Sequence, residues 1–72
     1  MPRLGSIKPK ELIRRLKRRG FMLDHQTGSH AVLLHSDGAR LIVPYHAREL
    51  KRGLLMSLIK QAGLTPEEFS GL

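Results

Sequence analysis

The middle of the chain, residues 27–38, reads TGSHAVLLHSDG. It contains a short apolar run between two turn signals, Thr-Gly before the run and Ser-Asp-Gly after it. Asp-Gly supports the positive φ values of tight hairpins. A run in which both the odd-numbered and the even-numbered residues are apolar is typical of a central strand packed on both faces. The pattern therefore predicts three successive antiparallel strands, at residues 21–26, 29–35 and 39–43, with Pro44 ending the ladder of the third.

An amphipathic helix is expected before these strands, over residues 8–19. Leu12, Ile13 and Leu16 have the spacing of one buried helical stripe. Gly20 then supplies the left-handed conformation that commonly ends a helix.

A second amphipathic helix is expected after the strands. It begins at Arg48 or Lys51 and ends at Ala62, before Gly63. The apolar positions that define its buried side are Leu54, Leu55, Leu58, Ile59 and Ala62.

Residues 64–69 carry the signature of a further short helix. Thr65 can cap it, Pro66 suits its first position, and Glu68 completes a capping box. Leu64 and Phe69 have the positions of a hydrophobic staple.

The order of the elements predicts an α+β fold: a helix, a three-stranded antiparallel meander and a helix, with the short helix appended. Two helices that pack side by side cannot cover both faces of a three-stranded sheet, so we expect both on one face. The other face is then open to a ligand, and Val32 or Leu34 would leave an apolar strip on it.

The composition limits the classes of protein. The chain has 72 residues, 13 Lys and Arg against 6 Asp and Glu, a formal charge of +7 and no cysteine. We expect one domain, residues 1–72, without disulfides or thiolate zinc sites. No apolar run is long enough to span a membrane, so a cytoplasmic protein is expected. The positive field attracts polyanions, and RNA, DNA and an acidic protein are the candidate partners.

The basic residues concentrate on the first expected helix. Lys10, Arg14, Lys17 and Arg18 follow i, i+4, i+7 and i+8 and form one stripe. Contact with several phosphates at once releases counterions and gives affinity without sequence preference. The alternative is a solvated face that keeps the protein soluble. The excess of cations over Glu11 favours contact with a polyanion.

Gly28, Ser29 and His30 lie where a turn leads into the central strand. A glycine and a small hydroxyl leave the backbone approachable and the imidazole unobstructed, which suits contact with a phosphate or a ribose. Histidine can take and return a proton near neutral pH. The alternative is a strand histidine that only packs or forms a hydrogen bond.

The other histidines do not suggest a metal site. His25, His30 and His35 are five residues apart, so along a strand they are expected to alternate faces. No carboxylate or thiolate has a ligand spacing beside them, and we expect no bound metal. His46 follows the third strand, where it either reaches a ligand or lies in solvent.

These residues make the chain similar to the HicA-type toxins, the small mRNA interferases of bacterial and archaeal toxin-antitoxin pairs. The matching stretches follow the order of the family along nearly the whole chain. They are residues 10–13, 19–21, 28–30, 35–38, 43–44, 49–53 and 59–64.

The resemblance implies a fold like that of double-stranded-RNA-binding domains, which agrees with the expected order of elements. It also implies that His30, the histidine of the Gly-Ser-His motif, is catalytic. A cognate HicB antitoxin would cover the active face and silence the enzyme.

We therefore expect a metal-independent endoribonuclease that acts on mRNA without a cofactor. His30 would be the general base on a ribose 2′-hydroxyl. Besides the helix stripe, we expect RNA contacts from Gly28, Ser29, His46, Lys51 and Arg52. The general acid is left open between His46, a protonated lysine and water.

Three departures from the family pattern bear on this expectation. Ser36 stands where the family commonly has proline, and Thr27 stands where a basic residue often precedes Gly-Ser-His. The strand after His30 is unusually apolar, which indicates either weaker RNA contact or a larger surface buried against a partner. A non-catalytic RNA- or DNA-binding module and a basic adaptor for an acidic protein are the alternative functions.

Overall fold

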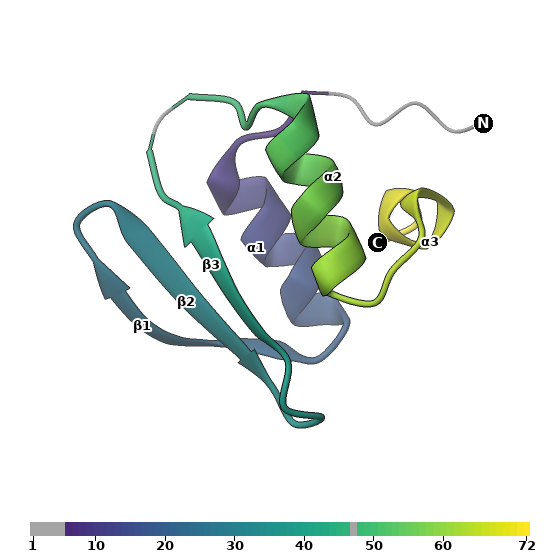
Figure 1. The fold of residues 1–72 in the computed structure, drawn as a ribbon, viewed down its shortest axis with the longest axis horizontal. Helices are drawn as coiled ribbons and strands as arrows, with labels where there is room; N and C mark the ends of the chain where they lie inside the picture. Colours follow the sequence, from purple (N-terminus) through teal and green to yellow (C-terminus); the bar gives the residue numbers. More distant parts are fainter. Residues whose placement is uncertain (1–5, 47) are drawn as a thin grey trace.

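The computed structural model describes residues 6–46 and 48–72, which form three helices and three strands (Figure 1). The elements are α1 (Pro9–Arg18), β1 (Phe21–Thr27), β2 (His30–His35), β3 (Arg40–Pro44), α2 (Arg52–Gln61) and α3 (Pro66–Ser70). This order confirms the α-β-β-β-α prediction with its appended helix. The second helix begins at Arg52 and not at Arg48, with Lys51 as its N-cap.

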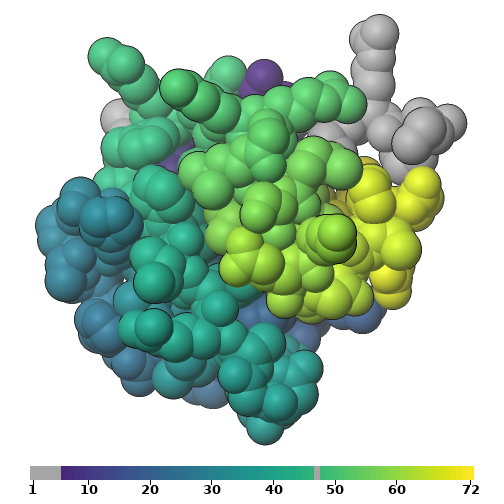
Figure 2. Space-filling view, viewed as in Figure 1, coloured from purple at the N-terminus to yellow at the C-terminus, as the bar shows by residue number. Residues whose placement is uncertain are grey.

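The sheet has the order β1-β2-β3, and both pairs of strands are antiparallel. The helices α1 and α2 lie on the same side of it, as predicted (Figure 1). In the space-filling view, α2 and α3 form one part of the surface and the strands form another (Figure 2). The prediction that β2 is the central strand is confirmed. Ala31 and Leu33 join the core that the helices cover, whereas Val32 on the other face is buried but is not part of that core.

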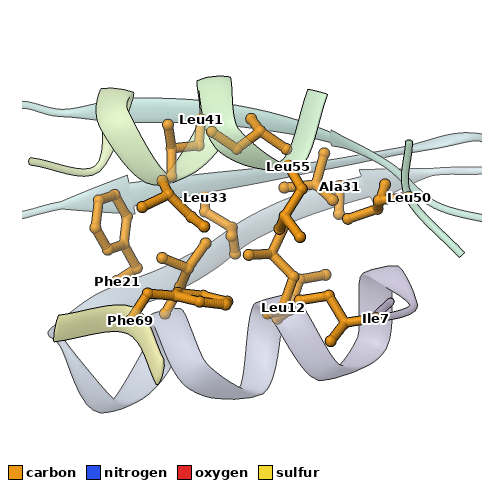
Figure 3. Close-up of a cluster of buried hydrophobic side chains, with 14 of the residues drawn as sticks. Ile7, Leu12, Phe21, Ala31, Leu33, Leu41, Leu50, Leu55 and Phe69 are labelled. Atoms are coloured by element: carbon orange, nitrogen blue, oxygen red, sulfur yellow. The ribbon is translucent and has the colours of Figure 1, made fainter. Parts of the chain in front are cut away.

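The core lies between the sheet and the helices. Leu33 and Leu41 from neighbouring strands meet Leu12 and Leu55 from the two long helices, and Phe69 from α3 joins the same cluster (Figure 3). All five side chains are almost completely removed from solvent. Burial of an aromatic or leucine side chain stabilises a fold by about 1.5–3 kcal/mol, so these contacts dominate the stability of so short a chain.

The predicted inner side of α2 needs one correction. Leu55, Leu58 and Ile59 are buried as expected, but Leu54 is 37% exposed. Leu54 is in the first turn of the helix, next to Gly53. The buried stripe therefore begins one residue later than the sequence pattern indicates.

The predicted stops and caps are present. Gly20 ends α1 with φ +93°, and Gly38 in the β2–β3 turn has φ +96°, values that other residues adopt at a steric cost. At the start of α3, the amide of Glu68 donates to Oγ1 of Thr65 at 3.1 Å. The amide of Thr65 donates back to the Glu68 carboxylate at 2.9 Å, which completes the capping box.

Strand β1 contains an irregularity that decides which side chains share a face. Leu23 pairs with Leu33, but the next pair joins His25 to Val32, so Asp24 is an extra residue. Such a bulge places two consecutive residues of one strand opposite one residue of its neighbour. Side chains that follow it are shifted by one position relative to simple alternation.

Candidate functional site

His30 is the first residue of β2 and is exposed. Its Cα is paired with Thr27 on one side and Pro44 on the other, so both neighbouring strands hold its backbone. The ring atom Nδ1 lies 3.0 Å from Oγ of Ser29. The atom Nε2 has no hydrogen-bond partner within residues 6–46 and 48–72, and it is therefore open to solvent or a ligand.

Gly28 and Ser29 form the turn that precedes His30. The amide of Tyr45 donates to the carbonyl of Ser29 at 2.8 Å, which ties this turn to the end of β3. A Cβ on Gly28 would meet no atom within 4 Å, and its φ is not positive. The fold itself does not require glycine here, and the backbone can be approached closely from outside.

His25 lies on the same face of the sheet as His30, and the prediction that the two alternate faces is wrong. The physical reason is the bulge at Asp24, which pairs His25 with Val32, two residues along β2 from His30. Directly paired residues project from the same face of a sheet. Nδ1 of His25 is 2.7 Å from a carboxylate oxygen of Asp24.

His35 has a structural role at the opposite end of β2. Its Nε2 donates to the carbonyl of Arg19 at 3.0 Å, and its Nδ1 accepts from the amide of Asp37 at 3.1 Å. Its ring also packs edge-on against Phe21, with centroids 4.9 Å apart. Both ring nitrogens are occupied by backbone groups, so His35 is not a candidate for catalysis.

A basic groove of about 600 Å³ lies between α1 and β1. We call it the α1–β1 groove. Three members of the predicted stripe line it, and Lys8 adds a fourth cation. The residues that line it are Lys8, Lys10, Glu11, Ile13, Arg14, Lys17, Leu23, Gln26 and Tyr45.

Glu11 forms ion pairs with Arg14 and Arg15 but not with Lys10 or Lys17. Its carboxylate accepts hydrogen bonds from Arg14 at 2.6 and 2.8 Å and from Arg15 at 2.7 Å. These bonds lower the pKa of Glu11 to about 2 and raise the pKa of Arg14. Lys10 and Lys17 have no ion pair within residues 6–46 and 48–72, so they offer the more available positive charge in the groove.

The remaining basic residues of α1 do not line the α1–β1 groove. Arg15 lies over the ring of Phe69, with its guanidinium carbon 5.0 Å from the centroid. Arg19 is 3.5 Å from the carboxylate of Glu68. Arg18 is exposed and is not among the residues that line the groove.

Three further predicted RNA contacts lie in the segment that follows β3. His46 is exposed, and its Nδ1 accepts from the amide of Arg48 at 3.2 Å. Lys51 is the N-cap of α2 and Arg52 is its first residue, and both are exposed. His46 lies two residues after Pro44, the residue paired with His30, whereas Lys51 and Arg52 lie outside the paired strands.

The open face of the sheet carries an apolar strip beside His30. Val32 and Leu34 follow His30 at intervals of two, so they both face outward. Met22, Leu34 and Ile42 are 72%, 38% and 47% exposed, whereas Val32 between them is 5% exposed. We call these four residues the outer strip.

A comparison with known protein families shows to which family this chain belongs. Residues 9–64 match the model of the family described as the HicA toxin of bacterial toxin-antitoxin. The chain belongs to the HicA toxin family. No significant match is found among curated proteins.

The HicA match covers every element except α3 and includes His30, the outer strip and all residues of the α1–β1 groove except Lys8. A HicA toxin acts within a toxin-antitoxin pair, so a HicB antitoxin is the partner that the family implies. No three His, Asp or Glu side chains converge as metal ligands in the part of this HicA chain that the structure describes. No helix there is long and apolar enough to cross a membrane.

Sequence reasoning missed two features of this HicA chain. Lys8 lies before α1 and outside its helical periodicity, yet it faces the same groove as Lys10 and Lys17. The pairing of Asp24 with His25 on the face of His30 was also missed, because it depends on the bulge. Asp24 and His25 are adjacent in the sequence, but no local signal shows which face of the sheet His25 occupies.

Proposed function

We propose that this HicA protein is an endoribonuclease that cleaves mRNA, with His30 as the general base. The observation that carries the proposal is one exposed imidazole whose Nδ1 faces Ser29 and whose Nε2 is open. When Nδ1 donates its hydrogen to Oγ of Ser29, the lone pair of Nε2 is available as a base. Membership of the HicA family supports the same class of reaction.

In the proposed reaction, Nε2 of His30 removes the proton of a ribose 2′-hydroxyl. The 2′-oxygen forms a bond to the adjacent phosphorus, and the bond from phosphorus to the 5′-oxygen breaks. The products end in a 2′,3′-cyclic phosphate and a 5′-hydroxyl. A positioned general base accelerates such a step by typically ~10² to 10⁴-fold.

The α1–β1 groove is the proposed path of the RNA backbone. Lys8, Lys10 and Lys17 supply positive charge along it, and Tyr45 at its border is bonded through its amide to Ser29. Tyr45 thus connects the groove, which lies on the helix side of the sheet, to the turn that precedes His30 on the other side. Phosphate contacts of this kind position the RNA without reading its sequence.

Other basic residues extend the proposed RNA surface. They are Arg14, Arg18, His46, Lys51 and Arg52, all of which are exposed. Cations near the reacting phosphate would stabilise the charge of the transition state. Each would also contribute to the salt dependence of RNA binding.

The proposed reaction needs proton transfer and electrostatic stabilisation only. The histidine chemistry of His30 requires a free imidazole, not a metal-bound one. We therefore propose that neither a metal ion nor a small-molecule cofactor takes part, and that cleavage continues in excess EDTA.

A HicB-like antitoxin is proposed to cover the outer strip and His30 together. Exposed apolar strips on small proteins mark binding sites, and the formal charge of +7 favours an acidic partner. Burial of Met22, Leu34 and Ile42 would slow dissociation of the complex. Titration of the protein encoded next to this chain should reduce cleavage in proportion, whereas full activity at saturation would refute this part.

The proposed reaction is tested with a defined RNA and its 2′-deoxy analogue. The purified protein should cut the RNA at mapped linkages and leave a 2′,3′-cyclic phosphate. A single 2′-deoxyribose on the 5′ side of a mapped linkage should abolish cleavage there and leave the other linkages unaffected. Binding of the RNA without any cleavage would show a non-catalytic RNA-binding module instead.

A further inference from the structure

We propose that His25 is the general acid of this reaction, and that the bulge at Asp24 places it for that role. The inference rests on the proposed ribonuclease function and adds the second proton-transfer group. Cleavage needs one group that removes the 2′ proton and another that protonates the departing 5′-oxygen. Two histidines on one face of a rigid sheet meet that requirement.

The register of the sheet sets the separation of the two rings. Thr27 is directly opposite His30, and His25 is two residues before Thr27 on β1. His25 and His30 are therefore diagonal neighbours, whose Cα atoms are about 7–8 Å apart in an antiparallel pair. A phosphodiester can lie between two imidazoles at that spacing, with each ring within hydrogen-bond reach of one of its oxygens.

The bulge is what makes this arrangement possible. In a regular ladder, Asp24 would pair with Val32 and alternation would direct His25 into the face that carries Leu23 and Leu33. With the bulge, Asp24 is the extra residue, and His25 pairs with Val32 and joins the outward set that begins at His30. Bulges commonly redirect a side chain next to an active site.

Asp24 fixes the orientation of the His25 ring. Its carboxylate accepts from Nδ1 at 2.7 Å, so the opposite atom, Nε2, points away from the carboxylate. A carboxylate that holds one ring nitrogen leaves the other for proton transfer. Both side chains are about half exposed, with 53% for His25 and 48% for Asp24, so a phosphodiester can reach Nε2.

The protons balance across the step. His30 begins neutral and gains the 2′ proton at Nε2, and His25 begins as the imidazolium and gives its Nε2 proton to the 5′-oxygen. His25 ends neutral, with its Nδ1 hydrogen still directed to Asp24. Exchange with water then restores both starting states.

His25 is a better placed acid than His46. Each histidine lies two residues from a residue paired with His30, His25 before Thr27 and His46 after Pro44. Their Nδ1 partners differ: Nδ1 of His25 donates to the carboxylate of Asp24, whereas Nδ1 of His46 accepts from the amide of Arg48 and would lose that bond in the imidazolium that an acid needs. The test distinguishes the two histidines.

The experiment replaces the leaving group. A short RNA carries sulfur in place of the bridging 5′-oxygen at a linkage that the wild-type protein cuts. A thiolate leaves without prior protonation, because thiols are far stronger acids than alcohols. Cleavage of this RNA and of its oxygen counterpart is measured for the wild type, His25→Ala, His30→Ala and His46→Ala, with Gln61→Ala as an exposed control on α2.

If His25 is the acid, His25→Ala loses about 10² to 10⁴-fold on the oxygen substrate and returns to the wild-type rate on the sulfur substrate. His30→Ala stays slow on both, because the base is still needed. Full activity of His25→Ala on the oxygen substrate, or rescue of His46→Ala in its place, would overturn the assignment to His25. A wild-type protein that cuts no linkage of any unmodified RNA, so that no such substrate can be chosen, would overturn the proposed function itself.

Discussion

The ring of His35 lies so close to Gly20 that it leaves no room for a side chain there. A Cβ on Gly20 would be 2.9 Å from Nε2 of His35. The ring cannot turn aside without loss of a hydrogen bond, because Nε2 donates to Arg19 and Nδ1 accepts from the amide of Asp37. This contact joins the end of α1 to the β2–β3 turn and fixes the end of the sheet opposite His30.

The Gly20 contact predicts a difference between two glycines with nearly the same backbone. Gly20 and Gly38 have φ +93° and +96°, but only Gly20 has a neighbour within 4 Å of its missing Cβ. Gly38→Ala should lose about 1–2 kcal/mol of unfolding free energy from its backbone alone. Gly20→Ala should lose clearly more, as measured by urea denaturation. Equal losses of unfolding free energy in the two variants would show that the His35 ring moves aside at little cost.

Substitution of Gly28, unlike that of Gly20, is expected to impair RNA binding and not the stability of the fold. Gly28→Ala should leave the free energy of unfolding unchanged or raise it by up to ~1 kcal/mol, because its φ is not positive and the space beside it is empty. RNA affinity and cleavage should fall, since the added methyl group faces the ligand. A stable variant with wild-type cleavage would exclude close approach of RNA to this turn.

The unpaired cations of the α1–β1 groove should account for salt-sensitive binding. Lys10→Gln with Lys17→Gln should lower the slope of log affinity against log salt by up to about 2, and by the same amount for RNAs of different sequence. Lys60→Gln on α2 is the control for loss of charge outside the groove. An unchanged slope in the double variant would identify the groove cations as a solvated surface only.

Glu11 makes the stability of α1 depend on pH. Its pKa in the folded protein is about 2 against an ordinary value of 4.5, because Arg14 and Arg15 donate to its carboxylate. The contribution of the Glu11 carboxylate to the free energy of unfolding is therefore complete above about pH 4.5 and is lost as the pH falls through 2. Wild type should be more stable than Glu11→Gln at pH 6, and the difference should shrink as the pH falls from 4.5 to 2. A difference that is constant with pH would contradict the lowered pKa.

Local signals made most of the fold predictable from the sequence. The capping box of Thr65 and Glu68 and the stop at Gly20 depend on residues close together in the chain, so their patterns indicated the correct elements. The bulge at Asp24 was not predictable, because the register between β1 and β2 creates it. The same holds for the α1–β1 groove, which brings Lys8 beside Leu23 from another element.

The central claim is that His30 transfers a proton during RNA cleavage. The most direct measurement is the rate at which purified His30→Ala cuts a defined RNA in excess EDTA, with circular dichroism and thermal unfolding measured on the same sample. His30 is exposed, and among residues 6–46 and 48–72 its ring forms a hydrogen bond with Ser29 alone, so the variant should fold like wild type. We expect the wild-type protein to cleave RNA in EDTA and the folded variant to lose about 10² to 10⁴-fold in rate. A folded His30→Ala protein that cuts RNA at the wild-type rate would contradict it.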